Sequence, residues 1–175
     1  GINGHEFNAN VLSTLSVEGD SSASSQLLQI AAYDGTDWGD WTNFTLRTNS
    51  VPVITISDQS VDLNATKNIS SAVSVTDGDG DTITKYKVKD TTGINSFVVS
   101  GSQVDATDIN GYEFASSALS TLSVKGDASA GTQTLQIAAY DGTAWGDWTD
   151  FTLTTLAANA LPTVSVKVPS SLTPN

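Results

Sequence analysis

The sequence contains a long internal duplication. Residues 2–48 align with residues 109–155 without a gap, and 34 of the 47 aligned positions are identical. A second match relates Asn49-Ser50-Val51-Pro52 to Asn159-Ala160-Leu161-Pro162. Self-similarity at a fixed period indicates a tandem array of structural units. We therefore expect a piece of a longer array, made of the second half of one repeat (1–48), one whole repeat (49–158) and the first strand of the next (159–175).

The duplicated stretch ends in a predicted β-hairpin. Apolar and other side chains alternate over residues 135–140 and again over residues 148–155, which is the period of half-buried strands. Asp141-Gly142 between them supplies turn chemistry, because Gly adopts positive φ without steric conflict and Asp caps its own backbone. The same pattern occupies residues 28–48.

The remaining strands are predicted from short apolar runs between turns. We expect a first strand at 53–56, a short extension at 60–63, a second strand at 69–76 and a third at 82–90, then short strands at 95–100, 102–105 and 119–124 and one helical turn at 115–120. In the third strand, Tyr86 and Val88 face one way and Lys85, Lys87 and Lys89 the other. No segment has sustained helical periodicity. An all-β fold follows: a Greek-key β-sandwich of immunoglobulin or cadherin type, repeated in tandem.

Charge limits the partners. The chain has 7 basic and 19 acidic residues, a net charge of −12 and a pI near 4.1. Nucleic acid and anionic membrane surfaces need a basic face, so both are unexpected partners. No apolar run is long enough to cross a membrane, and no signal peptide opens the sequence. The acidic surface suits metal cations, and the absence of Cys with an abundance of Ser, Thr, Asp, Asn and Gly favours a secreted bacterial surface protein.

Several of these elements together resemble a known group of proteins. The resemblance is carried by Pro52, the Asp77-Gly78-Asp79-Gly80-Asp81-Thr82-Ile83 loop, Tyr86 and the Ala139-Tyr140-Asp141-Gly142 ending. The chain resembles the cadherin-like and immunoglobulin-like tandem repeats of large bacterial surface adhesins, many of which have RTX-type tails. The resemblance covers 49–158 and the matching half, 1–48. It implies a spacer or adhesive unit at the bacterial cell surface, often made rigid by calcium.

The loop at 77–81 is the first candidate site. Its three carboxylates alternate with glycines and could converge on a hard cation, because calcium takes several oxygen ligands. It is not an EF-hand, since Thr82 and Val88 occupy positions where that loop needs Gly and Glu. In a sandwich, the loop shares one end with the 141–148 turn and the linker. The predicted calcium ligands are Asp77, Asp79, Asp81 and Asp141, with Asn49, Glu18 and Asp20 as further oxygen donors; a plain solvated turn is the alternative.

The tryptophans are the second candidate. Trp38, Trp41, Trp145 and Trp148 could stack on sugar rings, which makes a carbohydrate-binding module the alternative function. Packing is the other interpretation, and we expect Trp148 and Trp41 to cover the outer faces of their sheets. For Trp148 the partners would be Tyr140 and the lysine stems, while Trp145 could cover the edge of the core. The spacing resembles the Trp-Ser-x-Trp-Ser element of fibronectin-type receptor domains.

Catalysis is not expected. His5 is the only histidine, and Tyr112 replaces it in the second copy, so no base is available for nucleophilic chemistry in each repeat. Three N-glycosylation triplets, at Asn43, Asn64 and Asn68, are formal matches only. The sequence predicts a structural and adhesive repeat of an extracellular filament or adhesin. Its partners would be neighbouring repeats, other copies in a filament or surface layer, or surface glycans, and only 49–158 should fold alone.

Overall fold

The computed structural model describes residues 4–19, 24–159 and 161–166, and all structural statements refer to these residues. The strands are β1 (Ser24–Ile30), β2 (Thr42–Thr48), β3 (Val53–Ile56), β4 (Gln59–Asp62), β5 (Thr66–Asn68), β6 (Val73–Thr76), β7 (Lys85–Asp90), β8 (Phe97–Val99), β9 (Ser102–Gln103), β10 (Tyr112–Ala115), β11 (Ser123–Lys125), β12 (Gly131–Tyr140) and β13 (Thr149–Leu156). Three short 3₁₀ helices are η1 (Ala9–Thr14), η2 (Ser70–Ala72) and η3 (Ser116–Thr121).

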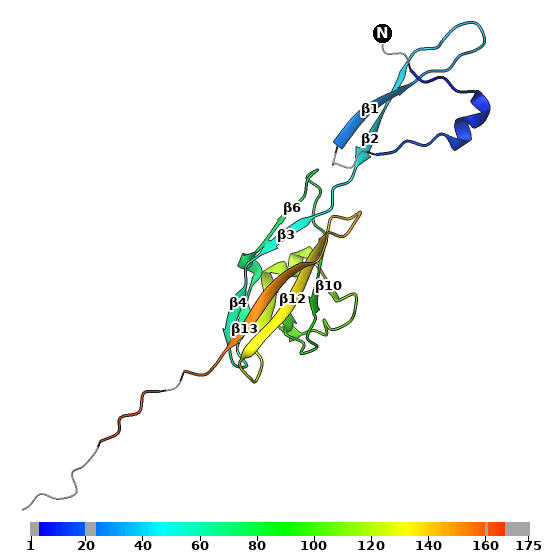
Figure 1. Cartoon of the computed structure of the whole chain (residues 1–175). Helices are drawn as coiled ribbons and strands as arrows, with labels where there is room; N and C mark the ends of the chain where they lie inside the picture. The colour runs from blue at the N-terminus through cyan, green and yellow to red at the C-terminus, as the bar shows by residue number, and fades with distance from the viewer. Residues whose placement is uncertain (1–3, 20–23, 160, 167–175) are drawn as a thin grey trace, which may run out of the picture.

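The strands from β3 to β13 form a two-layer sandwich (Figure 1). One layer is a five-stranded sheet in the order β10-β7-β12-β13-β4, and the other contains the four-stranded sheet β5-β11-β8-β9 and the pair β3-β6. The chain changes layers early: β3 pairs with β6 antiparallel, and β4 then pairs with β13 parallel. This arrangement confirms the predicted all-β, immunoglobulin-like sandwich.

The core lies between these two layers. Tyr86 and Val88 of β7 are buried there, as the alternating pattern predicts, beside apolar residues of β12 and β13. Phe97 of β8 meets Phe151 of β13 edge to face, with ring centroids 6.3 Å apart. Aromatic pairs of this geometry add about 0.5–1.5 kcal/mol beyond the area that they bury. The pair therefore joins the two layers near the centre of the core.

The predicted second strand differs from the structure. Instead of one strand over 69–76, the chain forms the short β5, the 3₁₀ helix η2 and then β6. Asn68 explains the break, because its Oδ1 accepts hydrogen bonds from the Ser70 backbone and hydroxyl, at 3.0 and 2.7 Å. Short polar side chains compete in this way with strand pairing. The strand expected at 119–124 is likewise shortened: η3 extends to Thr121, and β11 begins only at Ser123.

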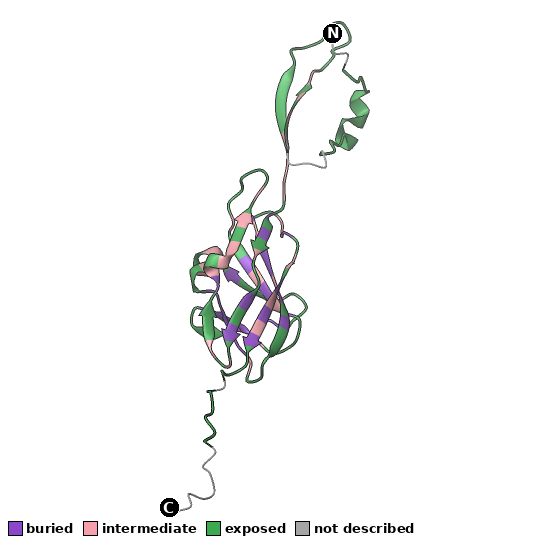
Figure 2. Cartoon of the chain, turned by 60° about the vertical axis from the view of Figure 1, so that its left-hand side comes forward, coloured by how far each residue is buried: buried purple, intermediate pink, exposed green. Residues whose placement is uncertain are grey.

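The described part of residues 1–48 forms an open structure beyond the end of the sandwich at which the chain enters (Figure 1). β1 and β2 pair as an antiparallel hairpin, from Ser24↔Thr48 to Ile30↔Thr42, and η1 precedes them. Figure 2 shows this part as almost entirely exposed, whereas buried residues gather between the layers of the sandwich. Leu15 is 48% exposed, while its repeat counterpart Leu122 is 0% exposed. The described part of 1–48 thus lacks the second layer that covers the same residues in the whole repeat.

The chain enters and leaves the sandwich at opposite ends (Figure 1). It enters at what we call the linker pole, formed by residues 49–52, 77–84 and 141–148. It leaves through β13, whose eight residues run the length of the sheet. No helix among the described residues is long and apolar enough to span a membrane.

Candidate functional site

The acidic loop at the linker pole is a self-capped turn. Asp77 Oδ1 accepts hydrogen bonds from the backbone N–H groups of Asp79 and Asp81, at 3.2 and 3.1 Å. This is the local capping that favours Asp in turns. Asp79 Oδ2 in turn accepts the backbone N–H of Ser50, at 3.1 Å. The loop therefore holds the linker directly.

Asp141 is the second contact between the sandwich and the linker. Its Oδ1 accepts the backbone N–H groups of Thr143 and Ala144, at 2.6 and 2.7 Å, and its Oδ2 accepts the side-chain amide of Asn49, at 2.9 Å. Burial by itself raises the pKa of Asp141, but the hydrogen bonds from Ala144, Asn49 and Thr143 outweigh it and the pKa is lowered. Asp141 is therefore a buried, ionised anchor for the linker.

The predicted calcium ligands are only partly brought together. Asp79 and Asp141 both reach the linker, through Ser50 and Asn49, but no three acidic or histidine side chains within residues 4–19, 24–159 and 161–166 are arranged to hold a metal ion. Glu18 is exposed, and Asp20 lies outside the described residues. Asp77 Oδ2 is the oxygen that fits a cation, because it is buried and has no hydrogen-bond partner in the described structure.

The outer face of the five-stranded sheet carries a stack of alternating cations and rings. Lys87 Nζ lies 4.3 Å from the Trp145 ring centroid and 4.6 Å from that of Trp148. Lys89 Nζ lies 6.0 Å from the Trp148 centroid and Lys85 Nζ lies 5.7 Å from that of Tyr140. We call these six residues the lysine–aromatic ladder. It arises because β7 pairs with β12, which places its outward lysines beside the turn that carries the tryptophans.

The predicted position of Trp148 on the outer face agrees with this arrangement, whereas that of Trp145 does not. Trp145 does not cover the core edge; it stacks on Tyr140, with ring centroids 5.1 Å apart and planes at 35°. An isolated antiparallel backbone bridge also pairs Tyr140 with Trp145. Lys87 thus lies over the rings of Trp145 and Trp148, at the surface that a sugar ring would need.

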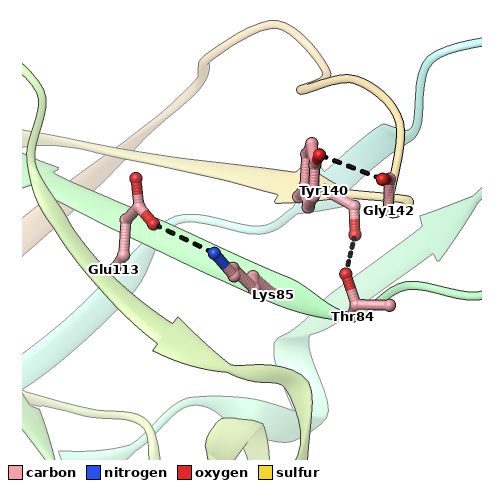
Figure 3. A network of polar contacts seen from close by, with 5 residues as sticks. All are labelled: Thr84, Lys85, Glu113, Tyr140 and Gly142. Carbon is pink, nitrogen blue, oxygen red and sulfur yellow. Dashed lines mark hydrogen bonds and ion pairs between the residues drawn. The ribbon is translucent and has the colours of Figure 1, made fainter.

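Further polar contacts fix the ladder at Tyr140 (Figure 3). The Tyr140 hydroxyl donates to the Gly142 carbonyl, at 3.0 Å, and the Thr84 hydroxyl donates to the Tyr140 carbonyl, at 3.3 Å. On the neighbouring strand β7, Lys85 forms an ion pair with Glu113 of β10, at 3.8 Å. The two hydrogen bonds of Tyr140 therefore hold the end of β12 to Thr84 and to Gly142, where the 141–148 turn begins.

The expectation that Trp41 packs against its own sheet is wrong. Trp41 is 55% exposed and Trp38 is 52% exposed. The stacking of Tyr33 on Trp38 is nonetheless the same as in the whole repeat, with centroids 5.2 Å apart. Trp41 lacks the cover of a lysine-bearing strand. In the whole repeat, β12 pairs with β13 on one edge and with the lysine-bearing β7 on the other, whereas β1 pairs with β2 and no described strand pairs with its other edge.

A buried polar cluster at the opposite end was not predicted. Asp90 is buried at the end of β7, where its Oδ1 accepts the N–H and hydroxyl of Thr92 and its Oδ2 accepts the N–H of Ser96. The Ser96 hydroxyl donates to Gln133 of β12. Burial raises the pKa of Asp90, but these hydrogen bonds outweigh it, so the pKa is lowered. The Asp-Thr-Thr-Gly sequence at 90–93 is turn chemistry that could have indicated this cap.

The fold and these contacts define a class of protein, an immunoglobulin-like β-sandwich in a tandem arrangement. No protein-family model and no curated protein matches the sequence. Among solved structures, domains 4 and 5 of the S-layer protein SbsC match at 17% identity and a TM-score of 0.36, over 77% of this chain and 59% of that chain. Domains d3–d4 of the rat CD45 extracellular region match at 16% identity and a TM-score of 0.34, over 89% of this chain and 76% of that chain. At such values neither likeness bears on function.

Proposed function

We propose that this chain is a structural and adhesive repeat of an extracellular bacterial surface protein, in which sandwiches follow one another as a stiff spacer. The observation that carries the proposal is the clamped linker. Asn49 and Ser50 are held by Asp141 and Asp79, so the chain enters the sandwich in a defined direction and leaves from the opposite end. Near-identical units connected in this way add length with each repeat.

Calcium at the linker pole is the second part of the proposal. Asp79 and Asp141 contact the linker, and with Asp77 and Asp81 they would supply carboxylate oxygens, the ligands that calcium prefers. The buried, unpartnered Asp77 Oδ2 supports a cation there, because a buried carboxylate oxygen without a partner is unfavourable. Oxygens from Asn49 and from Glu18 and Asp20 of the preceding unit would complete the shell, and the bound ion would then fix the angle between units.

The test is the thermal stability of the chain with and without calcium. A ligand that binds only the folded state stabilises it by about 2.7 kcal/mol at a hundredfold excess over its dissociation constant. We therefore expect calcium to raise the melting temperature of the sandwich, and Asp77→Asn to remove most of that increase. The matched control is Asp62→Asn, because Asp62 is an exposed acidic residue near the other end of the sandwich.

Two results would contradict the calcium part. One is a melting temperature that stays unchanged up to millimolar calcium. The other is an increase that Asp77→Asn and Asp62→Asn reduce equally, which would indicate general screening of a chain with a net charge of −12. Either result would leave the loop as a self-capped turn that holds the linker through Ser50 alone.

A further inference from the structure

The uncovered face of residues 4–48 has a covered counterpart in the same chain. Phe44 is 40% exposed, whereas its counterpart Phe151 is 3% exposed, and Leu15 and Leu122 differ in the same way. In the whole repeat, the residues that cover this face come from the segment 49–108, chiefly β3, β7 and β8. Since 34 of 47 aligned positions are identical between the two halves, the exposed side chains are chemically nearly the same as the covered ones.

Three glycines show where such a segment approaches the face. A Cβ on Gly146 would lie 2.0 Å from the Pro52 carbonyl oxygen, one on Gly126 would lie 2.3 Å from that of Asp62, and one on Gly111 would lie 2.4 Å from that of Val88. All three oxygens belong to segment 49–108. The first half of the chain keeps glycine at each corresponding position, Gly39, Gly19 and Gly4.

Gly39 is the most informative of these positions. In the described structure its Cβ position has only the Ala32 carbonyl nearby, at 3.5 Å, which is ordinary contact. Nothing in residues 4–48 as described therefore requires glycine there, whereas an incoming backbone like that at Pro52 would require it. Gly39 therefore leaves room for the backbone of a segment that docks on this face.

The outward-facing aromatic residues of the described part of 1–48 indicate which side chains the docking segment should carry. Tyr33 and Trp38 are already stacked as Tyr140 and Trp145 are, with centroids 5.2 and 5.1 Å apart. In the whole repeat these rings meet lysines at alternate positions of β7, whose inward residues Tyr86 and Val88 enter the core. Residues 1–48 carry six acidic and one basic residue, a net charge of −5 that favours a basic strand.

We propose that the β1–β2 hairpin and its uncovered apolar face are a docking surface for the first half of another repeat, a segment of the 49–108 type. The segment adds a strand of alternating lysine and apolar residues to the free edge of β1. Its backbone groups pair with β1, its apolar residues cover Phe44 and Leu15, and its lysines lie over Trp38 and Trp41. Addition of a strand to an exposed sheet edge is a general mode of recognition.

The experiment places a second copy of segment 49–108 directly before Ile2, in place of Gly1, so that its last residue precedes Ile2 as Asp108 precedes Ile109. Hydrogen exchange of the amides of β1 is measured in the original and the extended chain, with β12 as an internal check of the original sandwich. We expect β1 amides to exchange on the order of a hundredfold more slowly in the extended chain, and the Trp38 and Trp41 fluorescence to become less accessible to a soluble quencher.

Gly39→Ala supplies the matched variant. In the original chain its Cβ has room, so the exchange of β1 should not change. In the extended chain it should meet the docking backbone and restore fast exchange of β1, while β12 remains protected. The proposal is overturned if β1 exchanges equally fast in both chains while β12 stays protected, or if Gly39→Ala leaves slow exchange in the extended chain unaltered. Neither result would bear on calcium binding at the linker pole.

Discussion

Asn49 and Asp141 are 92 residues apart in sequence, yet the Asn49 side-chain amide lies 2.9 Å from Asp141 Oδ2. The contact joins the residue that follows β2 to the turn before β13. It couples the direction of the linker to the position of the 141–148 turn. A change at either residue should therefore affect both the stability of the sandwich and the order of the linker.

Asn49→Ala is expected to lower the free energy of unfolding by about 1.5–3 kcal/mol, the usual contribution of a hydrogen bond to a charged group. The variant also leaves the buried Asp141 carboxylate with one oxygen less well satisfied. Denaturant unfolding followed by circular dichroism measures the loss. Asn110→Ala is the control, because Asn110 is an exposed turn residue near the other end of the sandwich. Equal losses in the two variants would contradict a specific role for the Asn49–Asp141 contact.

Asp90 and Asp141, the two buried carboxyl groups whose pKa is lowered, should contribute to the pH dependence of stability. The pKa of each is lowered from its ordinary value of 3.8 in the folded state. Below 3.8 the unfolded chain binds more protons than the folded one, so stability rises with pH in this window and the contribution is complete above it. We expect melting temperatures to fall as the pH drops below about 3.8.

Asp90→Asn separates the contribution of one of these groups. The amide cannot accept the same set of hydrogen bonds from Thr92, Gly93 and Ser96, so the variant should be less stable at neutral pH. It should also lose less stability than the parent between pH 4 and pH 2, a range chosen to span the expected transition. A parallel decline of parent and variant over that range would show that Asp90 does not contribute.

Lys87→Met tests the lysine–aromatic ladder. Methionine keeps an apolar stem but removes the charge that lies over the Trp145 and Trp148 rings. We expect a loss of about 1–2 kcal/mol, since a cation–π contact contributes about 0.5–2 kcal/mol depending on its desolvation. Lys67→Met is the matched control, because Lys67 Nζ contacts only the Ser60 carbonyl, at 3.3 Å, in the described structure. If Lys87→Met lowers the free energy of unfolding no more than Lys67→Met does, the lysine–aromatic ladder does not stabilise the sandwich.

Gly146→Ala should be strongly destabilising, because its Cβ would lie 2.0 Å from the Pro52 carbonyl oxygen. Overpacking of this kind typically lowers stability by about 1–3 kcal/mol, and here the conflict is with backbone. Gly131→Ala, where nothing lies within 4 Å, should be close to neutral. Calorimetry of both variants is sufficient. A neutral Gly146→Ala would mean that the linker does not pass beside this turn as described.

The sandwich itself was predictable because its strands follow a simple alternation. The two-residue period of a strand is enough to predict that Tyr86 and Val88 face the core and that Lys85, Lys87 and Lys89 face outward. The structure agrees with this prediction. The break at Asn68 was not predictable in this way, since a side-chain hydrogen bond competes there with a continuous apolar pattern.

The candidate sites were predictable in part. Sequence order and fold type were enough to place Asp141 near the linker, but not to show that the Asn49 side-chain amide donates a hydrogen bond to one of its oxygens. The alternating pattern around Trp41 does not reveal that Trp41 is exposed, because this pattern is local. Its covering residues belong to a different segment, and only the three-dimensional contacts of Trp148 with Lys87 and Lys89 reveal which residues are needed.

Small-angle X-ray scattering can show whether the linker pole stiffens a series of sandwiches, in a chain extended before Ile2 by a second copy of 49–108. Scattering is compared in chelator and in millimolar calcium. We expect calcium to narrow the distribution of end-to-end distances to that of two sandwiches in line, and Asp77→Asn to abolish the narrowing. Identical, broad distributions in both conditions, with both sandwiches folded, would contradict it.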